Sequence, residues 1–95
     1  MYTPINAITG KAYQGNNVLT LTLSAANLKT SDPRWLTYLQ AKEKGWHVRQ
    51  GAKGTTITVI KETKIENDEK SEIKRMRKFF TVFNAIQIEG IEPLK

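Results

Sequence analysis

Two runs of alternating residues, separated by a polar segment, constrain the fold of this chain most. Residues 55–63 read TTITVIKET, in which Ile57 and Val59 alternate with polar side chains, as in a strand with one buried face. Residues 75–85 read RMRKFFTVFNA and are rich in the same β-forming residue types. The two runs predict an antiparallel β-hairpin. Residues 64–74, which are polar and of mixed charge, are expected to form its long, mobile loop.

Residues 16–28, NNVLTLTLSAANL, fit two structures. Leucines at every second position from Leu19 to Leu23 suggest a strand, whereas Leu19 and Leu23 themselves also fall at the spacing of a helix. The length of the segment favours a helix. Asn16 or Asn17 could cap its N-terminus by accepting a hydrogen bond from the free amides of the first turn. We therefore predict a helix that contributes to the core.

Residues 32–45 predict a second helix. Asp32, or Ser31 before it, suits the N-cap. Pro33 suits the first helical position, where the missing N–H of proline costs nothing. Gly45 suits the left-handed conformation that ends many helices.

One stripe of this second helix would combine basic and aromatic side chains. Arg34, Tyr38 and Lys42 fall at positions i, i+4 and i+8, so they would share one face. An aromatic ring between cations is typical of surfaces that bind single strands, because the ring stacks on a base and the cations contact phosphates. The simpler alternative is an amphipathic helix with a half-buried tyrosine and a lysine whose stem lies along the surface. Trp35 is assigned to the core.

A glycine-rich turn, QGAKG, occupies residues 50–54 after a short strand and is flanked by Arg49 and Lys53. Residues 1–15 are expected to form an irregular arm, and residues 86–95 an extended tail. At 95 residues the chain has the length of one domain. These elements predict a single α+β domain in which two helices pack on a small antiparallel β-sheet with a long β-hairpin.

The positive charge of the chain is concentrated in its middle. Fifteen Lys and Arg against nine Asp and Glu give a net charge of +6, and the sequence pI is about 9.7. Residues 29–54 alone hold six basic and two acidic side chains, a net +4. Such a concentration favours an anionic partner.

The composition also indicates a compartment. Cysteine is absent, which fits a reducing environment. The first residues lack a basic region followed by an apolar run, so they do not form a signal peptide. We expect a cytoplasmic protein that does not associate with a membrane.

The residues that catalysis requires are missing. The chain has one histidine, His47, and no cysteine, whereas a zinc site requires clustered ligands. A triad around His47 would have to use Ser24, Ser31 or Ser71, and none of these stands at a nucleophile elbow. We therefore expect a binding module that is not an enzyme, without metal, cofactor or small-molecule substrate.

Five segments together resemble one known family. They are NAITGKAYQGNNVL at residues 6–19, PRWLTYLQA at residues 33–41, GWHVRQGAKGT at residues 45–55, FTVFN at residues 80–84 and QIEG at residues 87–90. In this order they resemble the N-terminal domain of ArdC-type antirestriction proteins, a module shared with LtrC-like proteins and TraC-type conjugative primases. The resemblance covers nearly the whole chain.

The resemblance implies sequence-tolerant binding of single-stranded DNA, in the setting of plasmids, phages and evasion of host defence. In the family a metallopeptidase-like domain follows this module, and the present chain is expected to lack it. With the charge and aromatic pattern, the resemblance indicates nucleic-acid contacts at Lys11, Tyr13, Arg34, Tyr38, Lys42, Trp46, Arg49 and Lys53. The alternative is a protein–protein module whose basic and aromatic patch binds an acidic host partner, such as a restriction or defence protein.

Overall fold

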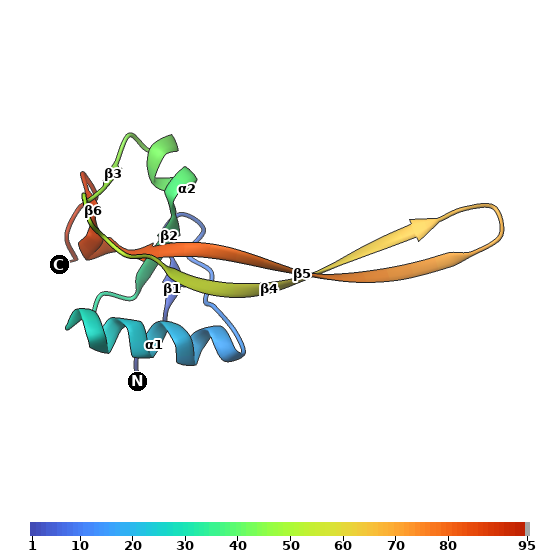
Figure 1. Cartoon of the computed structure of the whole chain (residues 1–95), viewed down its shortest axis with the longest axis horizontal. Helices are drawn as coiled ribbons and strands as arrows, with labels where there is room; N and C mark the ends of the chain where they lie inside the picture. Colours follow the sequence, from blue (N-terminus) through green and yellow to red (C-terminus); the bar gives the residue numbers. More distant parts are fainter. Residues whose placement is uncertain (95) are drawn as a thin grey trace.

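The computed structural model describes residues 1–94 and has two sheets. The elements in chain order are β1 (Ile5–Asn6), α1 (Asn16–Leu28), β2 (Arg34–Thr37), α2 (Tyr38–Glu43), β3 (His47–Val48), β4 (Thr55–Glu66), β5 (Ser71–Asn84), the 3₁₀ helix η1 (Ala85–Gln87) and β6 (Ile88–Glu89). The larger sheet has the strand order β1-β2-β5-β4, and β3 pairs with β6. Helix α1 lies on one side of the larger sheet, and α2 with the β3–β6 pair lies on the other (Figure 1). The predicted α+β fold is confirmed.

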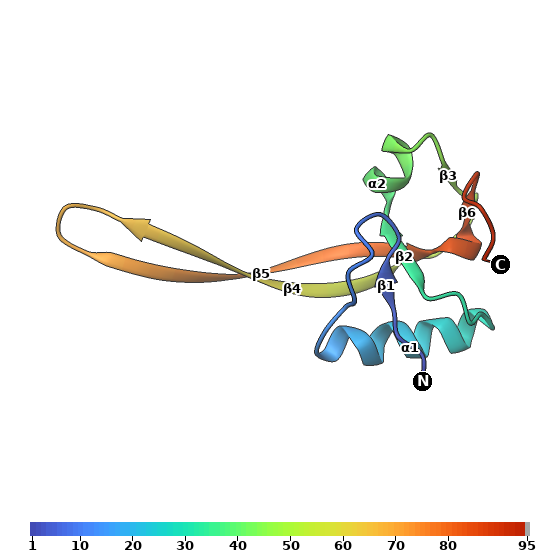
Figure 2. The ribbon, with the colours of Figure 1, turned by 180° about the vertical axis from the view of Figure 1, so that it is seen from behind.

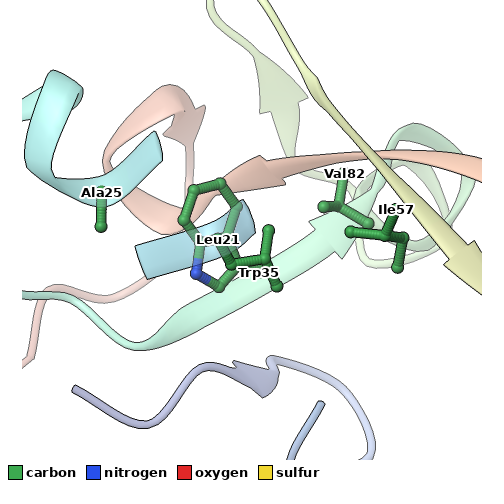
Figure 3. Close-up of a cluster of buried hydrophobic side chains, with 5 residues drawn as sticks. All are labelled: Leu21, Ala25, Trp35, Ile57 and Val82. Atoms are coloured by element: carbon green, nitrogen blue, oxygen red, sulfur yellow. The ribbon is translucent and has the colours of Figure 1, made fainter. Parts of the chain in front are cut away.

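The first hydrophobic cluster lies between α1 and the sheet. Figure 3 shows Leu21 and Ala25 of α1 against Trp35, Ile57 and Val82 from the strands. Trp35 is fully buried, as predicted. Its indole N–H donates to the hydroxyl of Tyr2 at 2.8 Å, and that hydroxyl donates to the backbone oxygen of Asp32 at 2.7 Å, so the buried polar group has a partner.

The second cluster lies on the opposite face of the sheet. Its buried members are Leu36, Ala41 and Ile88, with Phe83 and Trp46 packed against them. It joins β2 and β5 to α2 and to the β3–β6 pair. The two clusters explain the alternation in the sequence, because neighbouring residues of one strand enter different clusters.

Strands β4 and β5 continue beyond the body as a two-stranded arm (Figures 1 and 2). Their register runs without a break from Thr55 opposite Val82 to Glu66 opposite Ser71. The molecule measures 54 × 30 × 25 Å because of this arm. The predicted loop at residues 64–74 is therefore wrong in extent. Only residues 67–70 form the turn, and the polar residues on either side are paired, since a strand that is exposed on both faces needs no apolar alternation.

Helix α1 has the predicted bounds but a different N-cap. Its N-cap is Gly15, with φ 66°, and no side chain caps the helix. Asn17 instead accepts from the backbone N–H of Thr58 at 3.0 Å and donates to its backbone oxygen at 2.7 Å. The side-chain amide thus pairs with one backbone N–H and one C=O on the outer edge of β4, which no other strand within residues 1–94 covers.

The predicted helix over residues 32–45 is wrong in its first half. Residues 34–37 form β2, and helix α2 begins only at Tyr38. Trp35 and Leu36 are both fully buried but in different clusters, which requires the alternation of a strand. The helix begins with a capping box: Thr37 Oγ1 accepts from the N–H of Gln40 at 3.1 Å, and Gln40 Oε1 accepts from the N–H of Thr37 at 3.0 Å.

The expected arm and tail are partly regular. Strand β1, within residues 1–15, pairs in parallel with β2, so the sheet is not wholly antiparallel. Residues 86–95 were expected to be an extended tail, but their first part belongs to η1 and β6, and β6 pairs with β3. Among residues 1–94, no helix is long and apolar enough to cross a membrane.

Candidate nucleic-acid interface

Helix α2 and the chain that follows it carry five of the predicted contact residues. We use the name α2 surface for these five residues, Tyr38, Lys42, Trp46, Arg49 and Lys53, which lie close together in the sequence. The capping box fixes the start of the helix, so that Tyr38 occupies its first position with 57% of its surface exposed. Lys42 follows one turn later and is exposed on the same stripe. This half of the predicted basic and aromatic stripe is present.

Trp46 is partly buried and belongs in part to the second cluster. Its backbone N–H donates to the oxygen of Ala41 at 2.9 Å. A Cβ built on Gly90 would lie 2.9 Å from Cδ1 of the indole, so the tail packs directly on the ring. Trp46 therefore packs between the second cluster and the tail, and only part of its ring remains exposed.

Arg49 and Lys53 flank the turn that leads into β4. The guanidinium of Arg49 donates from Nε to the backbone oxygen of Ile86 at 3.0 Å, and from Nη1 to Glu89 Oε1 at 3.3 Å. More than half of this side chain is exposed, and ion pairs in such positions are weak enough to open for another anion. The backbone oxygen of Lys53 accepts a hydrogen bond from Gln87 Nε2 at 2.9 Å, which positions the turn. The side chain of Lys53 is exposed.

The segment from Tyr38 to Gly54 contains few carboxylates, although Glu89 reaches Arg49 from outside it. Residues 38–54 hold four basic side chains and one acidic side chain, Glu43. Within residues 1–94 no ion pair joins Lys42, Lys44 or Lys53 to a carboxylate.

Arg34 is not on the stripe of α2, although it lines a groove of about 480 Å³ together with Arg49 and Ile86. It lies in β2, so the expected stripe with Tyr38 does not form as predicted. Its guanidinium donates to Asp32 from Nε at 3.0 Å and from Nη2 at 2.8 Å, and Nη1 donates to the backbone oxygen of Glu92 at 2.8 Å. These hydrogen bonds to Asp32 raise the pKa of Arg34. Each nitrogen already has an intramolecular partner, so we leave Arg34 out of the interface that we propose.

Lys11 and Tyr13 lie in the loop before α1. Hydrogen bonds of Asn6 connect this loop to α2. The amide of Asn6 donates to the Tyr13 hydroxyl at 3.2 Å and to Gln40 Oε1 at 3.1 Å. Burial raises the pKa of Tyr13, and its ring packs against the first cluster. Lys11 is exposed. The hydrogen bonds of Asn6 thus connect this loop with Gln40, a residue of the capping box of α2.

The sequence analysis missed a groove at the root of the arm. It has a volume of about 730 Å³ and lies between the loop before α1 and strand β4. Its lining includes Tyr13, Gln14, Asn16, Ile60 and Arg77. The sequence gives little signal for it, since Arg77 lies far from the loop in the chain and reaches it only through the register of β4 and β5.

The comparisons with known proteins identify the family. The family model for the N-terminal domain of anti-restriction factor ArdC matches residues 1–84. The chain belongs to the ArdC N-terminal domain family. The metal-free crystal structure of the antirestriction ArdC protein from the R388 plasmid matches 95% of this chain with a TM-score of 0.76 and 40% identity. The Mn(II)-bound structure of that protein matches 96% of this chain with a TM-score of 0.74 and 43% identity.

Two curated relatives extend the comparison. A DNA primase TraC from Escherichia coli is 38% identical over 113 residues, which cover 99% of this chain and 10% of that protein. An uncharacterized protein, y4eC, from Sinorhizobium fredii (strain NBRC 101917 / NGR234) is 32% identical over 100 residues, which cover 96% of this chain and 33% of that protein. The chain therefore spans a third or less of the length of these relatives. Among residues 1–94, no three His, Asp or Glu side chains are grouped so that they could hold a metal ion.

Proposed function

We propose that this ArdC N-terminal domain binds single-stranded DNA with little dependence on base sequence. The observation that carries the proposal is the stripe of α2 on which Tyr38 is exposed and is followed one turn later by Lys42, a lysine that has no carboxylate partner within residues 1–94. Single strands are bound in this way because every base has a face that can stack on an aromatic ring. Phosphate contacts add affinity without reading the sequence.

The roles of the residues follow from their positions. Tyr38 stacks on a base, because its ring is more than half exposed and lies outside both clusters. Lys42 and Lys53 contact phosphates, and Arg49 does so when its exposed pair with Glu89 opens. Each phosphate contact releases counterions, so the affinity falls as salt rises.

The substitution Tyr38→Ala tests the proposal. We expect it to weaken binding of a labelled single strand by about 1–3 kcal/mol, the usual contribution of one stacked base, in a fluorescence anisotropy titration. Leu39→Ala is the matched control, because Leu39 is the next residue of the same helix and is exposed to 66%. Equal losses in both variants, or no loss in either, would remove Tyr38 from the site. Binding of an acidic protein in place of DNA would support the protein-partner alternative.

A further inference from the structure

The arm formed by β4 and β5 distributes its charges unequally between its two faces. Residues that are directly opposite in an antiparallel ladder share a face. Lys78 is opposite Val59, Lys61 is opposite Met76, and Lys74 is opposite Thr63. We call the face with these three lysines the lysine face; within the body it continues into the face that packs on α1.

Four of the five charged side chains on the opposite face are paired, and the fifth, Arg77, has no ion pair within residues 1–94. Arg75 Nε lies 2.9 Å from Glu62 Oε1, and Lys64 Nζ lies 2.9 Å from Glu66 Oε1. The lysine face has no such pair within residues 1–94, and its one carboxylate on the arm, Glu72, stands next to the turn. The lysine face thus has three cations and one carboxylate, a net +2, whereas the opposite face has three cations and two carboxylates, a net +1.

The lysine face has a spacing that suits a nucleic-acid strand. Side chains on one face of a strand recur about every 6.8 Å, so Lys78, Lys61 and Lys74 succeed one another at about that interval from the body outward. This interval resembles the separation of successive phosphates in an extended single strand. Met76 and Phe80 lie on the same face and are 54% and 36% exposed, which offers bases an apolar surface.

The lysine face begins at the groove at the root of the arm. Val59, which is opposite Lys78, lines this groove together with Tyr13 and Arg77. The amide of Asn6 bridges the Tyr13 hydroxyl and the side chain of Gln40 in α2. The lining of the groove combines an aromatic ring, amides and the guanidinium of Arg77, which belongs to the opposite face of the arm.

We infer that the lysine face is a second contact surface for the phosphates of a single strand, on the side of the sheet that carries α1. This inference rests on the proposed function. It extends the binding site by the length of the arm, so the affinity must grow with strand length. A short strand occupies the α2 surface alone.

The experiment compares two variants of the arm on two strands of different length. Lys61→Gln with Lys74→Gln removes two charges from the lysine face, and Lys64→Gln with Arg75→Gln removes two from the opposite face of the same stretch. All four side chains are exposed, so both variants should fold. Anisotropy titrations use labelled homopolymers of about 6 and about 20 nucleotides, at several salt concentrations.

We expect the wild type to bind the longer strand more tightly. The lysine-face variant should lose this gain and keep the affinity for the short strand, and the magnitude of its salt slope on the long strand should fall by about 1.4, which corresponds to two phosphate contacts. The control variant should lose less affinity. If the wild type binds DNA but both variants lose the same affinity for the long strand, or the lysine-face variant loses none, the inference is overturned. A wild type that bound neither strand would overturn the proposed function as well.

Discussion

Gly54 shows how one residue is determined by a contact that lies far away in the sequence. Strand β5 passes close to its Cα: a Cβ built there would clash with Cγ2 of Thr81 and lie 3.1 Å from Cζ of Phe83. The φ angle of Gly54 is not positive, unlike that of Gly51 at 82°. Gly54 is therefore required for the close approach of β5, and Gly51 for the conformation of the turn.

The substitution Gly54→Ala tests this account of the contact. We expect the added methyl group to lower the free energy of unfolding by about 1–3 kcal/mol, because overpacking forces neighbours out of position. Urea denaturation followed by circular dichroism measures it. Adding Thr81→Ala should recover part of the loss, since it removes the atom that clashes. Wild-type stability of Gly54→Ala, or no recovery in the double variant, would contradict the assigned contact.

Residues on the helices show the limit of sequence patterns at this scale. The helical spacing in residues 16–28 predicts α1 correctly, yet Leu19 and Leu23 are 62% and 58% exposed while Leu21 and Ala25 are buried. Apolar residues occur on more than one side of this helix, so spacing alone does not decide which side packs on the sheet. The contact between Asn17 and Thr58, which orients the helix, joins residues that are distant in the sequence.

At the scale of elements, β2 and α2 show how a strong local signal can mislead. Ser-Asp-Pro before Arg34 is a typical helix start, but the carboxylate of Asp32 accepts from the backbone and the guanidinium of Arg34 instead. The true start signal is the Thr-x-x-Gln sequence from Thr37 to Gln40, a capping box. The hairpin was predictable because its inner half alternates; its outer half has no buried face to leave such a pattern.

The arm is expected to be dispensable for folding. Both clusters draw on β4 and β5 only at Ile57, Val59, Val82 and Phe83, and a two-stranded ribbon alone is at best marginally stable. Replacing residues 62–75 with Asn-Gly, which closes the ladder where Lys61 is opposite Met76, should change the free energy of unfolding by less than about 1 kcal/mol.

Chemical denaturation of the shortened chain measures this difference. Ile57→Ala in the full chain is the contrasting variant, because it truncates a side chain that is 4% exposed in the first cluster. It should cost about 2–5 kcal/mol. Loss of cooperative unfolding in the shortened chain would show that the arm contributes to the stability of the body.

At the scale of the whole molecule, the family and the fold class were both accessible from the sequence, and the shape of the interface was not. The order of the motifs predicts the ArdC N-terminal domain, and the family match confirms it. The predicted contact residues stay a prediction, but the structure separates them. Five lie in α2 and the chain that follows it, Lys11 and Tyr13 lie in the loop before α1, and Arg34 is held by Asp32 and shares a groove with Arg49. The length and position of the arm follow from the register of β4 and β5, which no sequence pattern reveals.

The measurement that tests the account most directly is an anisotropy titration of one labelled single strand and its matching duplex, each at low and at physiological salt. An exposed ring can stack on the unpaired bases of a single strand, whereas the bases of a duplex are already stacked on one another. The account predicts tighter binding to the single strand, with an affinity that falls steeply as salt rises. Tighter binding to the duplex, or no binding to either at low salt, would contradict it.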